Sequence, residues 1–150
     1  RAAHAPGRFL DDLIHLDGVS EPEIPDTRAA QLVLASDFYG PIDAIERFVS
    51  REAGEGRTGS LLQIVDPLEL DFPYSGRVRF RIPGLDLEKI FGRAETVRDD
   101  YMARFKARQS ALQEICEQVG WQFFSHSTAD PAVETTFALL QSLAVEDVTR

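Results

Sequence analysis

The fold is decided by residues 31–66, which read QLVLASDFYGPIDAIERFVSREAGEGRTGSLLQIVD. Two short apolar runs, residues 31–36 and 60–65, each end at an aspartate, and such runs are typical of strands buried on both faces. Between them, Gly40-Pro41 opens a predicted helix, because proline suits a first helical turn, and this helix ends near Gly54. Strand, helix and strand in this order predict a βαβ unit with two parallel strands.

The remainder of the chain extends the same pattern. Residues 97–119 predict the longest helix, residues 121–125 (WQFFS) a third buried strand, and Asp130-Pro131 the start of a final helix. In residues 77–82, apolar and arginine residues alternate, which predicts a half-buried strand at a sheet edge. The expected buried stripes are Ile42, Ile45, Phe48 and Val49; Val97, Tyr101, Phe105, Leu112, Ile115, Cys116 and Val119; and Val133, Phe137, Leu140 and Leu143.

We expect a single domain over residues 1–150. Residues 8–16 have the spacing of a short amphipathic helix, and residues 17–30 read as a loop or linker, so the α/β part covers residues 31–145. The 150 residues are 43% hydrophobic, which is ordinary for a globular α/β domain.

Charge and cysteine content narrow the class of partner. Acidic residues outnumber basic ones 25 to 16, a formal charge of −9. This balance argues against nucleic acid or an anionic membrane as the main partner, because both require clustered Lys and Arg. No apolar run is long enough to predict a membrane segment. The single Cys116 fits a reducing compartment, so we expect a cytoplasmic protein.

Asp37 is the most interesting candidate site residue. It follows the first buried strand and precedes a helix, the place where open α/β sheets bind ligands, and its carboxylate could hold Mg²⁺. The favoured alternative is that Asp37 caps the following helix or a turn. Asp66 ends the second strand in the same way, but Pro67 follows at once and favours a turn-forming role.

Other motifs have a plainer explanation. Residues 54–59 (GEGRTG) match the GxGxxG dinucleotide fingerprint, but a helix precedes them and a strand follows, the reverse of the required order. The carboxylates of Glu69 and Asp71 could share acid and base roles, yet an acidic surface loop explains them equally well. Cys116 on an apolar stripe indicates a small buried residue.

The histidines and the arginine row are also weak signals. The cluster of Ser125, His126, Ser127 and Asp130 lacks a nucleophile elbow, so a histidine in a strand-end loop is the simpler interpretation. His4 and His15 do not have zinc-site spacing. The row of Arg77, Arg79 and Arg81 is the only basic cluster; a solvated strand face is favoured over an acidic partner.

Residues 61–80, LLQIVDPLELDFPYSGRVRF, resemble the signature of the bacterial domain-of-unknown-function family number 58, whose genes often lie beside those of MoxR-type AAA+ ATPases. Weaker similarity covers residues 32–41 (LVLASDFYGP), Asp100-Tyr101 with Arg104, Gly120-Trp121 and residues 128–131 (TADP). Glycine at position 76 also predicts a turn with a positive φ. The motif positions are Asp66, Pro67, Phe72, Pro73, Tyr74, Ser75, Gly76 and Arg77.

The resemblance implies a von Willebrand factor A-like fold, a Rossmann-like parallel sheet with helices on both faces. In such folds a DxSxS loop, a threonine and a later aspartate can hold a divalent metal; Asp37 matches that aspartate, but no DxSxS occurs here. The three buried strands would be the fourth, fifth and sixth of the fold, which leaves the sheet incomplete at residues 31–36. We therefore expect the carboxyl-terminal half of a longer domain, completed by a missing amino-terminal half or by a homodimer.

The function implied by the resemblance is a non-enzymatic adaptor or scaffold that works with a MoxR-type AAA+ ATPase and needs no cofactor. The alternative is a divalent-metal-dependent ligand-binding domain, in which Asp37 binds Mg²⁺ together with residues outside this chain. A hydrolase that uses His126 and a nearby carboxylate is the weakest of the three hypotheses.

Overall fold

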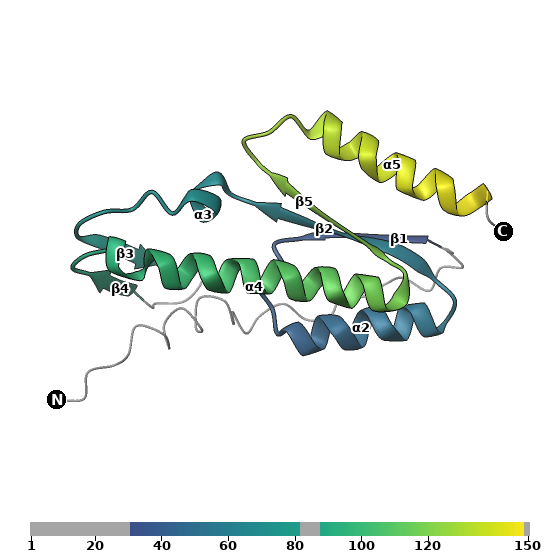
Figure 1. The fold of residues 1–150 in the computed structure, drawn as a ribbon, viewed down its shortest axis with the longest axis horizontal. Helices are drawn as coiled ribbons and strands as arrows, with labels where there is room; N and C mark the ends of the chain where they lie inside the picture. The colour runs from purple at the N-terminus through teal and green to yellow at the C-terminus, as the bar shows by residue number, and fades with distance from the viewer. Residues whose placement is uncertain (1–30, 82–87, 149–150) are drawn as a thin grey trace.

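The computed structural model of the protein describes residues 31–81 and 88–148, so the predicted helix at 8–16 and the linker at 17–30 lie outside the described residues. The described part is a mixed α/β fold (Figure 1). Its elements in chain order are β1 (Gln31–Ser36), α2 (Ile42–Gly54), β2 (Thr58–Val65), α3 (Pro67–Asp71), β3 (Val78–Arg81), β4 (Glu88–Phe91), α4 (Glu95–Val119), β5 (Gln122–Ser127) and α5 (Ala132–Val148).

The three predicted buried strands form one parallel sheet in the order β1-β2-β5. Val33 lies opposite Ser60, and Leu61 lies opposite Phe123. The βαβ prediction is therefore confirmed, with β2 between its two neighbours. Within the described residues, β1 pairs with a strand only on the side of β2.

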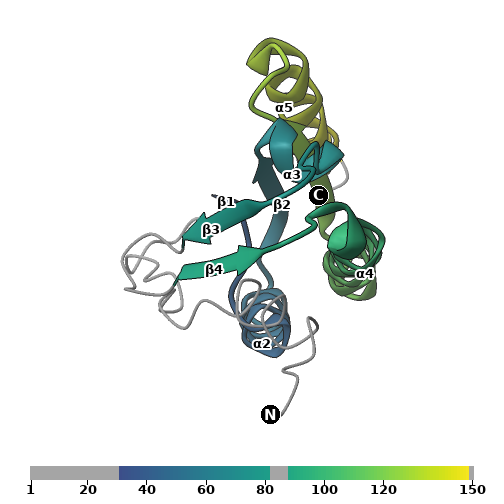
Figure 2. The ribbon, with the colours of Figure 1, turned by 90° about the vertical axis from the view of Figure 1, so that its left-hand side faces the viewer.

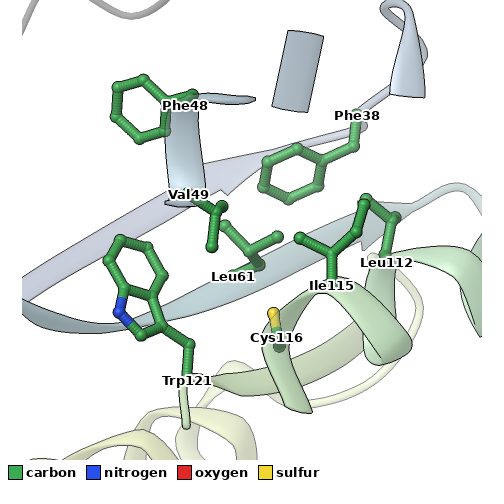
Figure 3. Close-up of a cluster of buried hydrophobic side chains, with 8 residues drawn as sticks. All are labelled: Phe38, Phe48, Val49, Leu61, Leu112, Ile115, Cys116 and Trp121. Carbon is green, nitrogen blue, oxygen red and sulfur yellow. The ribbon is translucent and has the colours of Figure 1, made fainter. Parts of the chain in front are cut away.

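Helices cover both faces of this sheet. Helices α2 and α4 lie on one side and α5 on the other (Figures 1 and 2). The core between the sheet and the first pair of helices contains eight buried side chains (Figure 3), which are Phe38, Phe48, Val49, Leu61, Leu112, Ile115, Cys116 and Trp121. The predicted stripe of α2 and the second half of that of α4 thus face this core, with Ile42, Ile45 and Val119 partly buried at its margin. At the start of α4, Val97 and Tyr101 pack instead in a second buried cluster with Phe72 and Ala94.

The strand predicted at residues 77–82 does not lie at an edge of the parallel sheet. Residues 78–81 form β3, which pairs antiparallel with β4 in a separate two-stranded sheet near the start of α4 (Figure 2). The prediction of a strand is confirmed, and in a two-stranded sheet it lies at an edge. Its expected place beside the parallel sheet was wrong, because period-two alternation identifies a strand but not its partner. The partner, Glu88–Phe91, is too short and too charged to give a clear signal.

The predicted buried stripe of α5 was wrong for three of its four residues, and only Leu143 is half-buried. Val133, Phe137 and Leu140 are 71%, 61% and 57% exposed. The side of α5 that faces the sheet carries Thr135, which hydrogen-bonds His126 of β5, and the buried Ser142. The half-buried Leu139 and Leu143 lie towards the sheet as well. Because α5 thus carries apolar residues on two sides, periodicity alone chose the outward one.

Within residues 31–81 and 88–148, no helix combines the length and the apolar character that spanning a bilayer would require.

Candidate functional site

Polar side chains gather at the carboxyl ends of β1 and β2, beside the middle of α4. We call Asp37, Tyr39, Glu69, Tyr101 and Arg108 the carboxyl-edge cluster. They come from the loop after β1, from α3 and from α4, so three elements distant in sequence meet there. This is the edge of a parallel α/β sheet at which ligands usually bind.

The buried guanidinium of Arg108 fixes the loop after β1. Its Nε donates to the carbonyl oxygen of Phe38 at 2.7 Å, and its Nη2 donates to the carbonyls of Phe38 and Gly40. Phe38 has a φ of 55°, a left-handed conformation that non-glycine residues seldom adopt. Desolvation lowers the pKa of Arg108 from its usual value, although the charges of Tyr39 and Asp37 oppose that shift. Arg108 therefore supplies a buried positive charge that holds a strained loop in place.

Asp37 is exposed at the end of β1 and closes a turn. Its Oδ1 accepts from the backbone amide of Tyr39 at 3.1 Å and from Ser36 Oγ at 3.4 Å. By accepting from the amide of Tyr39, Asp37 plays the turn-capping role that the sequence favoured. In the part of the chain that the structure describes, no three His, Cys, Asp or Glu side chains come together so as to hold a metal ion.

Tyr39 links Glu69 to Tyr101. Its side chain hydrogen-bonds both of them, and burial raises its pKa above the ordinary range for tyrosine. Desolvation raises the pKa of Glu69, reinforced by the nearby charges of Asp66 and Asp37 and opposed by hydrogen bonds from Tyr39 and Asp66. Burial likewise raises the pKa of Tyr101 to about 12. The cluster thus favours the protonated form of Glu69 more than water does.

The residues between positions 66 and 77 that carry the resemblance build the neighbouring turn. Asp66 and Glu69 form a capping box around α3: Leu68 N donates to Asp66 Oδ1 at 2.8 Å and Asp66 N donates to Glu69 Oε2 at 3.3 Å, with Pro67 in the first turn. The turn-forming role predicted for Asp66 is confirmed. Phe72 follows in a left-handed conformation with a φ of 41°.

The second half of the motif docks on α4. The ring of the buried Phe72 lies 5.1 Å from that of Tyr74 and 4.8 Å from that of Tyr101. Gly76 has the predicted positive φ, 68°; its amide donates to Glu95 Oε2 and its carbonyl accepts from Ala94 N, both at 2.8 Å. The other three motif residues, Pro73, Ser75 and Arg77, are exposed. The motif therefore attaches the turn to the start of α4.

A chain of amides runs beneath the cluster. The side-chain amide of the buried Gln63 donates to the carbonyl of Asp37 at 3.3 Å, and Gln109 Nε2 contacts Gln63 Oε1 at 3.1 Å and Ser125 Oγ at 3.2 Å. This chain of hydrogen bonds joins the carboxyl ends of all three parallel strands. Sequence reasoning missed Gln63, Gln109 and Arg108. For Arg108 a signal existed, since it lies between Phe105 and Leu112 on the buried face of α4.

The remaining candidates are held apart from this cluster. His126 Nδ1 lies 2.9 Å from Thr135 Oγ1, while Ser125 contacts Gln109, so these two neighbours in sequence have different partners. Asp71 is exposed, whereas Glu69 is half-buried in its bond to Tyr39. Burial raises the pKa of Cys116 to about 11, as expected for a packed thiol.

The glycine-rich loop at residues 54–59 leaves α2 and enters β2, as predicted. Arg57 pairs with the buried Glu52, and its guanidinium lies 2.9 Å from the carboxylate of Glu55. The charge of Arg57 is therefore already paired with carboxylates of the protein. Trp121 Nε1 donates to the carbonyl of Arg57 at 3.1 Å. A Cβ on Gly59 would lie 2.8 Å from the carbonyl oxygen of Leu32. The last glycine is therefore explained by close packing of β2 rather than by a phosphate.

Comparison with known proteins gives no relative: no family model, curated protein or solved structure matches the chain. What the arrangement can do is therefore argued from its own geometry. The carboxyl edge presents an exposed carboxylate, Asp37, on a loop whose backbone carbonyls accept hydrogen bonds from Arg108 and Gln63. A polar edge of this kind is suited to recognition of a partner or ligand.

Proposed function

We propose that the chain is a non-enzymatic protein-interaction module, an adaptor or scaffold that works with a MoxR-type AAA+ ATPase. The observation that carries the interaction role is the outer side of α5, where Val133, Phe137 and Leu140 stand exposed in one row. Exposed rows of large apolar side chains are typical of binding surfaces. The choice of a MoxR-type ATPase as partner rests on the resemblance of residues 61–80 to domain-of-unknown-function family number 58.

The polar groups at the carboxyl edge support an adaptor rather than an enzyme. Arg108 donates hydrogen bonds to two backbone carbonyls, and Asp37 accepts one that closes a turn. Glu69 accepts hydrogen bonds in the capping box and from Tyr39. These bonds shape the surface, and each group already has a structural task. Such a rigid scaffold favours recognition over chemistry.

We also propose a von Willebrand factor A-like fold whose sheet continues beyond β1. The order β1-β2-β5 is consistent with one half of a doubly wound sheet. β1 reads QLVLAS, without charge or proline, and so lacks the residues that usually protect an edge strand. An amino-terminal half of the domain, or a second copy of the chain, would supply the neighbouring strand.

A direct binding measurement tests the adaptor role. The full chain would be immobilised and titrated with a purified MoxR-type ATPase from the same genome. We expect saturable binding that Phe137→Asp weakens about tenfold or more, the size of a hot-spot loss. Gln118→Asp, which adds the same charge at an exposed position of α4 on the other side of the sheet, is the matched control. Absence of saturable binding by the unaltered chain would contradict the adaptor proposal.

The alternative function is divalent-metal-dependent ligand binding with Asp37 as a ligand. It is favoured by the exposed Asp37 carboxylate at the carboxyl end of β1, close enough to Glu69 to raise the pKa of that group. Calorimetric titration with Mg²⁺ would compare the full chain, Asp37→Ala and the control Asp71→Ala, which alters another exposed carboxylate. Equal Mg²⁺ binding in all three would remove Asp37 from any metal site.

A further inference from the structure

The two-stranded sheet of β3 and β4 forms a lobe apart from the parallel sheet. Figure 2 shows it beside the start of α4, on another side of the molecule from α5. Val78 packs against the buried cluster that contains Phe72 and Ala94. Because successive side chains of a strand point to opposite faces, Arg77 and Arg79 lie on the face that Val78 does not use. The lobe therefore has an inner face toward α4 and an outer face that carries these arginines.

The outer face combines cationic and apolar side chains. Arg77 and Arg79 are both exposed. The antiparallel register places Ile90 of β4 opposite Arg79, and residues directly opposite one another share a face. Ile90 is 43% exposed. We define Arg77, Arg79 and Ile90 as the outer face of the lobe. Arginine is one of the residues that protein interfaces contain more often than the rest of the surface.

The charge of the lobe is opposite to that of the rest of the chain. Residues 72–94 hold five of the 16 basic residues and two of the 25 acidic ones, a net charge of +3. The remaining residues hold 11 basic and 23 acidic ones, a net charge of −12. Among the side chains that the structure describes in residues 72–94, the charged ones are Arg77, Arg79 and Arg93, and all three are exposed. The lobe is therefore a basic surface on an acidic protein.

The sign of this charge defines the chemistry of the partner. Complementary charges steer a partner to its surface and disfavour wrong partners, so a basic surface fits an acidic one. The exposed Glu95 and Asp99 follow at the start of α4, so the basic surface is small. A nucleic acid or an anionic membrane would extend beyond it onto acidic neighbours, whereas a short acidic segment of a protein would not.

We propose that the outer face of the lobe binds a short acidic segment of a partner protein, whose carboxylates pair with Arg77 and Arg79 and whose apolar side chain contacts Ile90. Because β3 lies outside the parallel sheet, its arginines do not protect an edge of that sheet. The inference goes beyond the proposed function, since it concerns a surface separate from α5 and does not depend on the ATPase.

The test uses a labelled synthetic peptide of Glu-Glu-Leu repeats, titrated with the full chain and followed by fluorescence anisotropy. Peptides of Gln-Gln-Leu and Glu-Glu-Ser repeats remove the charge and the apolar side chain in turn. We expect saturable binding of the Glu-Glu-Leu peptide, about tenfold tighter than that of the Gln-Gln-Leu peptide, with the Glu-Glu-Ser peptide in between.

Variants of the chain locate the peptide on the lobe. Arg77→Glu and Arg79→Glu should each weaken binding about fivefold or more, and the milder Arg77→Gln should weaken it less. Lys106→Glu makes the same change of charge at an exposed position in the middle of α4 and is the matched control, with affinity within about twofold of the unaltered chain. Circular dichroism of each variant confirms that it is folded.

Several outcomes would overturn the inference. Protection of the strand from unwanted pairing, the role that the sequence favoured, predicts no saturable binding of any peptide. Equal loss of affinity in Arg77→Glu and Lys106→Glu would reduce the effect to overall charge. Tighter binding of an oligothymidylate than of the Glu-Glu-Leu peptide would make a nucleic acid the occupant. Self-association of the unaltered chain in sedimentation that Arg77→Glu abolishes would make a second copy the occupant.

Discussion

The guanidinium of Arg108 donates to the carbonyl oxygen of Phe38, a residue 70 positions earlier in the chain. The bond joins the middle of α4 to the loop that carries Asp37 and Tyr39. Since Phe38 adopts a left-handed backbone, the loop needs an anchor to keep this conformation. Arg108 is that anchor, and the carboxyl-edge cluster depends on it.

Replacing Arg108 by methionine should therefore destabilise the fold. The change leaves the carbonyls of Phe38 and Gly40 without their donor, and we expect the free energy of unfolding to fall by about 2–3 kcal/mol. Urea unfolding followed by circular dichroism measures the loss. Arg98→Met alters an exposed arginine of the same helix and should stay within about 0.5 kcal/mol of the unaltered chain. A loss of unfolding free energy no larger than that of the control would mean that the loop after β1 keeps its conformation without Arg108.

Two phenylalanines that helical spacing predicts to be buried should respond differently to truncation. Phe105 is 4% exposed and Phe137 is 61% exposed. We expect Phe105→Ala to cost about 3–5 kcal/mol and Phe137→Ala to change stability by no more than about 0.5 kcal/mol. Thermal unfolding of the two variants side by side decides this. A large loss of stability for Phe137→Ala would show that the row of Val133, Phe137 and Leu140 on α5 is already covered within the chain.

The glycine-rich loop gives a matched pair of substitutions. A Cβ on Gly59 would lie 2.8 Å from the carbonyl oxygen of Leu32 and 2.9 Å from the ring of Trp121, whereas a Cβ on Gly54 meets nothing within 4 Å. Gly59→Ala should cost about 1–3 kcal/mol by overpacking. Gly54→Ala should be neutral or stabilising by about 0.4–1 kcal/mol, since it restricts only the unfolded chain. Equal melting temperatures would refute the packing explanation of Gly59.

Glu69 should make stability depend on pH. Desolvation raises its pKa in the folded protein above 4.5, so the folded state binds the proton more tightly than the unfolded chain does. Stability then falls as pH rises from 4.5 through the raised pKa and levels off above it. Glu69→Gln removes this dependence while keeping an acceptor for the capping box.

The measurement is urea unfolding of both proteins over that pH window, with Glu46→Gln as a control at an exposed site. The difference between the unaltered chain and Glu69→Gln should shift in favour of the variant as pH rises. A constant difference would mean that the fold does not perturb Glu69.

The main sheet could be predicted from the sequence because its signals are local. The runs at 31–36 and 60–65, the proline after Gly40 and the aspartates that end the strands each act within a few residues. The stripe of α4 was correct for the same reason: only one side of that helix is apolar. The separate β3–β4 pair was not predicted, because a strand's partner is set by tertiary packing.

The candidate site was harder to predict. Asp37 and Asp66 could be picked out from their place after strands, and their turn-forming roles followed from residue type. Arg108 and Gln63 could not be paired with the loop after β1, because their contacts depend on how α4 lies across the sheet. The prediction of which side of α5 is buried failed for a related reason. A helix with apolar residues on two sides does not indicate which side meets the sheet.

The central place of β2 affects how the chain folds. β1 and β2 are joined by one short helix, so their pairing closes a small loop, whereas β5 can join β2 only after α3, β3, β4 and α4 have been made. The entropy lost on closing a loop grows with its length, which makes the second pairing the slower and costlier event. During synthesis on the ribosome, β2 therefore waits with one edge bare until the third strand emerges, and this interval is when the chain is most open to mispairing or to capture by a chaperone.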